Sequence, residues 1–183
     1  MRVYRVLPYL PSAREGEAGH PLYVHKQQGA GRLDNPDAYL VRYVTDAGIA
    51  AVAEAFGQFE LWTPALLQGP PALPGSRMVL AELQLPDQVR ILDLDDAKNL
   101  VTWSLRPSRV VTRDRAVTQA WARNIFDSGQ YDGARWWSYY NPDLASIGVW
   151  GGPDLETLQI HELEPLQGIY EEARLTLMRG WVG

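Results

Sequence analysis

Residues 39–57 read YLVRYVTDAGIAAVAEAFG, and this stretch predicts a strand followed directly by a helix. Residues 39–44 are rich in β-branched and aromatic side chains, which is typical of a strand. Thr45 or Asp46 then caps a helix that we predict over residues 47–57, with Gly57 helping to end it.

The predicted helix is apolar on nearly all sides. At about 100° per residue, its core face carries Ile49, Val52, Ala53 and Phe56. The opposite face carries Ala47, Ala50, Ala51 and Glu54. Because a helix that is apolar nearly all round is usually buried, we expect Glu54 to be mostly buried beside a cleft. The alternative is an exposed, alanine-rich helix, since alanine is the best helix former.

Further strands are predicted on both sides of this unit, at 2–6, 78–85, 89–94, 133–140, 147–150 and 158–163. Further helices are predicted at 95–100, at 113–127 between a Thr112 cap and a Gly129 stop, and at 169–178. Pro86 and Asp87 separate two of the strands, which we interpret as a hairpin or as two successive segments of a sheet. Strands mixed with helices, without a regular βαβ repeat, favour the α+β class. We expect one domain over residues 1–183.

The composition excludes several classes of protein. The chain has 183 residues, 46% hydrophobic and 21% charged, as in ordinary globular domains. Its 17 Lys and Arg against 22 Asp and Glu give a net charge of −5, which disfavours a nucleic-acid-binding surface. The absence of cysteine excludes disulfides and thiol nucleophiles. No apolar run approaches the roughly 20 residues of a membrane span, and the N-terminus does not resemble a signal peptide, so we expect a soluble, cytoplasmic protein.

A glycine-flanked arginine precedes the strand and helix, in GAGRLDNP at 29–36. Gly29 and Gly31 permit backbone conformations that are closed to other residues and let a ligand approach the main chain. Arg32 presents a planar fork that suits a diphosphate or a carboxylate. The stretch is neither a P-loop nor a dinucleotide fingerprint. The alternative is an ordinary turn with a solvated arginine.

An aromatic-dense stretch, YDGARWWSYY, occupies residues 131–140. Alternation places Trp136, Ser138 and Tyr140 on one face of a strand, so the Ser138 hydroxyl needs a polar partner. No G-x-S-x-G elbow surrounds this serine, which disfavours a hydrolase nucleophile. The three histidines are scattered, and the aspartates at 93, 95 and 96 are typical of a strand end and a helix cap, so no metal site is predicted.

In their order along the chain, these features resemble the RES family of bacterial toxins, which is named for its Arg, Glu and Ser and is paired with Xre-type antitoxins. Residues 29–57 look like the family's Arg turn, strand and Glu helix, and residues 131–150 look like its Ser region. The resemblance covers nearly the whole chain. Many members have Arg-Trp-Asn after the glycine turn, where this chain has Arg32-Leu33-Asp34-Asn35, so the role of Asn35 is open.

The resemblance implies an ADP-ribosyltransferase-like fold, with a mixed β-sheet core and flanking helices. It also implies NAD as a substrate, with no further cofactor, and cleavage of the nicotinamide–ribose bond. Carried over to this sequence, Glu54 and Arg32 would be catalytic, and Arg32, Tyr43 and Ser138 would bind the substrate. Glu54 would lie beside an oxocarbenium-like ribose, and Arg32 would hold a diphosphate or phosphate. Tyr43 would stack on or hydrogen-bond to the nicotinamide half, and Ser138 would orient Arg32 or Glu54 or bind the ribose.

Two functions are open at this point. One is an NAD-consuming toxin-like enzyme that transfers ADP-ribose to inorganic phosphate, water or a protein, with an Xre-type antitoxin as partner. The other is a non-catalytic member of the same fold that binds a nucleotide or a partner protein. Neither involves nucleic acid or a membrane.

Overall fold

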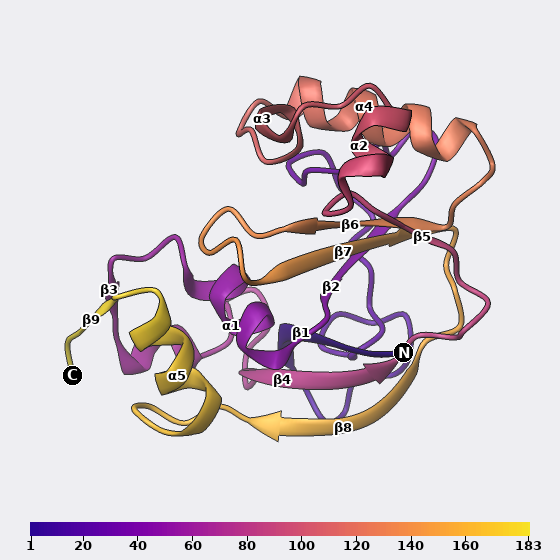
Figure 1. Ribbon diagram of the computed structural model, residues 1–183. Helices are drawn as coiled ribbons and strands as arrows, with labels where there is room; N and C mark the ends of the chain where they lie inside the picture. Colours follow the sequence, from indigo (N-terminus) through magenta and orange to yellow (C-terminus); the bar gives the residue numbers. More distant parts are fainter.

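A seven-stranded mixed sheet with the order β5-β6-β7-β2-β1-β4-β8 forms the centre of the computed structural model, which describes residues 1–183 (Figure 1). Its strands are β1 (Arg2–Tyr9), β2 (Val41–Thr45), β4 (Arg77–Gln84), β5 (Ile91–Asp93), β6 (Gly133–Trp137), β7 (Ala145–Trp150) and β8 (Glu156–Glu162). Within this sheet, only the β5–β6 pair is parallel. The predicted α+β class is confirmed.

Five α-helices flank the sheet: α1 (Gly48–Phe56), α2 (Ala97–Thr102), α3 (Pro107–Val110), α4 (Arg115–Asp127) and α5 (Gly168–Thr176). Figure 1 shows α1 and α5 together on one flank and α2, α3 and α4 grouped at the other end. A 3₁₀ turn, η1 (Pro64–Leu67), follows β3 (Leu61–Trp62), and β3 pairs in parallel with β9 (Gly180–Trp181). No helix in the structure has the length and apolar character of a membrane-spanning segment.

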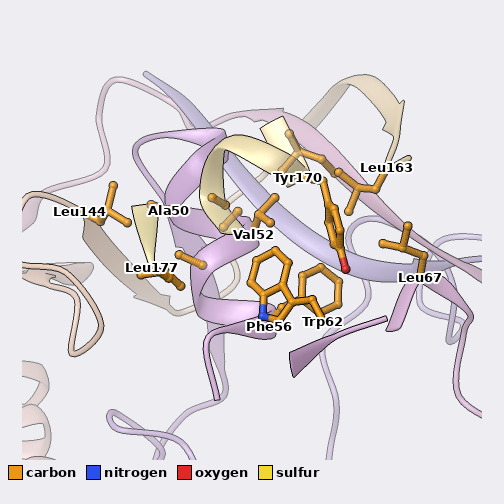
Figure 2. Close-up of a cluster of buried hydrophobic side chains, with 13 residues drawn as sticks. Ala50, Val52, Phe56, Trp62, Leu67, Leu144, Leu163, Tyr170 and Leu177 are labelled. Carbon is orange, nitrogen blue, oxygen red and sulfur yellow. The ribbon is translucent and has the colours of Figure 1, made fainter. Parts of the chain in front are cut away.

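The α1 flank holds one of three hydrophobic clusters. Phe56 of α1 packs against Trp62 and Tyr170, with ring centroids 5.6 Å away in both cases (Figure 2). Ala50 and Ala53 are fully buried in the same cluster. The small alanine side chains let α5 approach α1 closely, so part of the alanine face predicted to line a cleft is covered by protein.

The four predicted helices agree with the structure to within two residues at each end, whereas the short helix α3 was not predicted and two of the predicted caps are wrong. Ala47 occupies the N-cap of α1 without a side-chain hydrogen bond. Asp46 instead forms an ion pair with Arg135 at 3.0 Å, which draws its carboxylate away from the helix. Asp114, rather than Thr112, caps α4 by accepting hydrogen bonds from the N–H groups of the first turn.

Two strand predictions also need correction. The strands at 77–84 and 91–93 do not form a hairpin, because β4 and β5 lie toward opposite ends of the sheet. The strand predicted to reach residue 140 ends at Trp137, and the Ser138 N–H donates to the carbonyl of Leu144 within the connection to β7.

The first two strands of the chain separate almost at once. Strand β1 pairs with β4 over eight residue pairs but with β2 only through Tyr4 and Thr45. On its other side, β2 pairs with β7 over five residues. The sheet is therefore open between β1 and β2.

Candidate active site

A pocket of about 340 Å³ lies where β1 and β2 separate, with α1 beside it. This volume falls in the range of roughly 300–1,000 Å³ that is typical of small-molecule sites. Its lining residues come from β1, β2, α1, the Gly31 turn, the start of α4, and the β6–β7 region. They are Tyr4, Arg5, Val6, Gly31, Arg32, Tyr43, Val44, Thr45, Ala51, Glu54, Ala55, Arg115, Trp136, Tyr139 and Ser146.

Arg32 is buried and fixed by the backbone of a distant segment. Its Nη1 donates to the carbonyl oxygens of Val110, at 2.5 Å, and Thr112, at 2.9 Å. Burial, together with the positive charge of Arg115, lowers the pKa of Arg32 to about 10, so the side chain stays charged at neutral pH. The structure thus contradicts the alternative of a solvated turn arginine.

The turn that carries Arg32 is closed by Asp34. Its Oδ2 accepts from the backbone N–H groups of Gly29 and Gly31, at 2.8 and 2.7 Å, and its Oδ1 accepts from the hydroxyl of Tyr43, at 2.6 Å. A side chain at Gly31 would collide with both the Tyr43 hydroxyl and the Asp34 carboxylate. Glycine is therefore required at this position by the close approach of these two groups.

Asn35, whose role the sequence left open, ties the same turn to α4. Its Nδ2 donates to the hydroxyl of Tyr39, at 2.9 Å, and to the carbonyl of Gln119, at 3.0 Å. Asn35 is not among the residues that line the pocket. Asn35 is a positioning residue for the turn.

Tyr43 presents its ring to the pocket while its hydroxyl is occupied. The hydroxyl donates to Asp34 and accepts from the N–H of Leu33, at 2.9 Å. Burial and the hydrogen bond to Asp34 raise the pKa of Tyr43 well above its ordinary value, so the hydroxyl remains protonated. The ring lies edge-on to Trp136, with centroids 6.4 Å apart. Its single hydroxyl donor is therefore used within the protein, so toward a ligand Tyr43 offers its ring and, at most, one acceptor lone pair.

Ser138 is connected to the pocket by a hydrogen bond to Glu54. Its Oγ donates to Oε1 of Glu54 at 2.5 Å and accepts from the N–H of Tyr140 at 3.1 Å. Ser138 is buried and does not itself line the pocket, whereas Glu54 does. The expectation that Glu54 is mostly buried is wrong: α1 exposes this carboxylate to solvent, because its buried faces are used by β1 and α5.

The pocket is more positive than the chain as a whole. Arg5, Arg32 and Arg115 line it, and Glu54 is the one carboxylate among the lining residues. Arg5 is held by donating to the carbonyls at positions 21 and 23, and its burial lowers its pKa to about 10. A pocket with this balance of charge favours an anionic ligand, although the net charge of the protein is −5.

Arg5, Arg115 and Ser146 are among the lining residues that were not identified from the sequence. Of these, only Arg115 has a sequence feature that could have identified it. It lies in the first turn of a helix, where a positive charge opposes the helix dipole. Arg5 and Ser146 lie in strands whose pattern is ordinary, and only the separation of β1 from β2 brings them to a pocket.

No group of three or more histidine, aspartate or glutamate side chains is placed to share a metal ion.

Scans of the sequence against protein-family models and against curated proteins find no match. The structure is similar to the MbcT toxin in the crystal structure of the M. tuberculosis MbcT–MbcA toxin–antitoxin complex, with a TM-score of 0.65 and 17% sequence identity. The similarity covers 95% of this chain and 88% of that chain. At this identity the likeness establishes a shared fold.

Proposed function

We propose that this protein is a toxin-like enzyme that cleaves the nicotinamide–ribose bond of NAD and transfers ADP-ribose to phosphate, water or a protein. The observation that carries the proposal is the carboxylate of Glu54, held by Ser138, in the same pocket as the buried Arg32. The toxin fold of the structural neighbour supports the toxin-like part of the proposal.

The chemistry requires a negative charge close to the ribose. As the bond between ribose C1′ and the nicotinamide nitrogen breaks, its electron pair goes to the ring nitrogen, and nicotinamide leaves as a neutral molecule. Positive charge then develops on the ribose, and a fixed carboxylate stabilises it. Glu54 supplies this carboxylate, and the hydrogen bond from Ser138 fixes its direction.

The remaining walls suit the rest of the dinucleotide. Tyr43, Trp136 and Tyr139 provide aromatic faces for a ring and limit access of water. Arg32 provides positive charge for the diphosphate. An oxygen of the acceptor then bonds to C1′, and a water or protein hydroxyl that attacks releases its proton to solvent.

An antitoxin is the protein partner that this proposal implies. The structural neighbour is described as part of a toxin–antitoxin complex, and the sequence resemblance points to an Xre-type partner. Binding of the partner would inhibit NAD consumption.

The test is to incubate the protein with NAD, with and without inorganic phosphate, and to measure free nicotinamide. We expect nicotinamide to accumulate with wild type and not with Glu54→Gln. A dependence of the rate on phosphate identifies phosphate as the acceptor. NAD that binds to wild type without any release of nicotinamide would contradict the proposal and favour a non-catalytic binding protein.

A further inference from the structure

Two of the lining residues have a buried polar atom without a hydrogen-bond partner in the protein: Nη1 of Arg115 and Oγ of Ser146. A buried polar group that stays unpaired destabilises the fold, so each one requires an explanation. Both side chains line the same pocket, so a ligand bound there would satisfy these atoms after a small shift of either side chain toward it. Arg115 is the more informative of the two, because it also carries a charge.

Arg115 is held rigidly beside the turn that carries Arg32. Its Nε donates to the carbonyl of Ala30 at 3.0 Å. One helical turn later, Nε2 of Gln119 donates to the carbonyls of Gly29 and Gly31, at 2.9 and 3.0 Å. Arg32 in turn reaches back to the carbonyls at 110 and 112, just before α4. Arg115 is therefore anchored to the turn that carries Arg32, and Arg32 is anchored to the segment that precedes Arg115.

The charges of these two arginines are not neutralised within the protein. Neither Arg32 nor Arg115 takes part in an ion pair, in contrast to Arg90, Arg123 and Arg135. Arg115 is also the first residue of α4, where the helix dipole is positive. The positive charge of Arg115 contributes to the lowered pKa of Arg32. Like charges held close together in a pocket destabilise the empty protein and favour binding of an anion.

We propose that Arg115 and Arg32 form the two sides of a clamp for phosphate oxygens. Nη1 of Arg115 and the N–H groups of Arg32 that are not used by the backbone would donate to the anion from opposite sides. The ligand class is a phosphate or phosphoanhydride. The assignment to the diphosphate of NAD, or to an acceptor phosphate, rests on the proposed function, whereas the clamp itself does not.

The test is calorimetric titration of the full chain with inorganic diphosphate and, separately, with inorganic phosphate. The variants are Arg115→Met, which removes the charge and the donors, and Arg115→Lys, which keeps the charge and loses the fork. Arg106→Met is the matched control, because this exposed arginine is outside the pocket and its side chain makes no hydrogen bond or ion pair. Thermal unfolding of each variant checks the fold.

We expect wild type and Arg106→Met to bind diphosphate equally, and Arg115→Met to bind it about 10- to 150-fold more weakly, as loss of a charge-assisted hydrogen bond predicts. Arg115→Lys should lie between them. Tighter binding of diphosphate than of phosphate would assign the clamp to NAD, and the reverse order to an acceptor phosphate. A titration of wild type that shows no heat of binding would overturn the proposed clamp. Unchanged affinity in folded Arg115→Met or Arg115→Lys would overturn it as well.

Nicotinamide release separates this inference from the proposed function. Release of nicotinamide by a protein that does not bind diphosphate would overturn the clamp and leave the proposed function standing. Diphosphate binding that depends on Arg115, in a protein that releases no nicotinamide, would overturn the proposed function and support the clamp.

Discussion

The hydroxyl of Ser138 donates a hydrogen bond of 2.5 Å to Oε1 of Glu54, although the two residues lie 84 positions apart in the chain. Glu54 extends from α1 into the open pocket, and Ser138 is buried just beyond the end of β6. One residue thus supplies an accessible charge and the other fixes its position.

Glu54→Gln is expected to abolish most NAD cleavage while the fold is kept. Glutamine has nearly the same shape and its Oε1 still accepts from Ser138, so only the charge is lost. Removing one electrostatic contact to a transition state lowers turnover by about 10²–10³-fold. Because the hydrogen bond from Ser138 then goes to a neutral group instead of a charged one, the free energy of unfolding should fall by about 1 kcal/mol. Initial rates of nicotinamide release equal to those of wild type would exclude the carboxylate from the reaction.

Ser138→Ala is expected to lower kcat by about 10- to 100-fold, less than Glu54→Gln, because a hydrogen bond to a charged group is worth about 1.5–3 kcal/mol. KM for NAD should change little, since Ser138 does not line the pocket. The decisive measurement is the double variant. If Ser138 acts only through Glu54, adding Ser138→Ala to Glu54→Gln causes no further loss. Losses that multiply would show that Ser138 has an independent effect.

The strand and helix at 41–56 were predictable because their patterns are local. Val41–Thr45 has the composition of a strand, and Gly48–Phe56 has the apolar periodicity of a helix. Asp46 shows the limit of such reasoning. Its position before the helix predicts a cap, but an ion pair with Arg135, which is 89 positions away, determines where its carboxylate points.

Local patterns pointed to Glu54, Arg32 and Ser138, and the family resemblance added Tyr43 and joined the four into one site. The structure brings three of them into one pocket and places Ser138 against Glu54. Their spacing alone could not have placed them there. The pocket depends on the separation of β1 from β2, which no local pattern encodes. Arg115 lies in a helix that was predicted for other reasons, and Ser146 lies just before the strand predicted at 147–150. The approach of both residues to the pocket depends on tertiary packing.

Ser146→Ala is expected to weaken NAD binding without weakening the fold. The Ser146 hydroxyl is buried without a partner, so its removal relieves an unpaired polar group, and the melting temperature should stay the same or rise. If the hydroxyl contacts the ligand, KM for NAD rises. Thr157→Val is the matched control, because the Thr157 hydroxyl is also buried and unpaired but lies on β8, outside the pocket. Equal KM values for wild type, Ser146→Ala and Thr157→Val would show that Ser146 does not contact NAD.

Tyr43→Phe and Tyr43→Leu separate the hydroxyl from the ring. Phenylalanine keeps the aromatic wall but loses the hydrogen bonds to Asp34 and Leu33, so we expect a loss of stability of about 1–3 kcal/mol and a small change in KM. Leucine also removes the ring, and we expect KM for NAD to rise further. Denaturant unfolding and nicotinamide release measured on both variants test this. A KM for Tyr43→Leu no higher than that for Tyr43→Phe would contradict a stacking role.

Arg32→Lys and Arg32→Ala test whether Arg32 binds the ligand or only supports the fold. Lysine keeps the positive charge but lacks the planar fork, so one ammonium cannot both reach the two carbonyls at 110 and 112 and bind an anion. Both variants should lose stability, by about 1–3 kcal/mol, because buried carbonyls lose their donor. If Arg32 also binds phosphate oxygens, Arg32→Lys raises KM for NAD by about 10- to 150-fold, and Arg32→Ala raises it more.

Arg135→Lys is the control that distinguishes these two roles of Arg32. The guanidinium of Arg135 is also held by several partners, including Asp46 and Asp93, but it lies outside the pocket. Its replacement should therefore lower the melting temperature and leave KM for NAD unchanged. The measurement is nicotinamide release against NAD concentration, at a temperature where all the variants are folded. Superimposable curves for wild type, Arg32→Lys and Arg32→Ala would mean that Arg32 only stabilises the turn. Arg32 would then be excluded from the residues proposed to bind NAD.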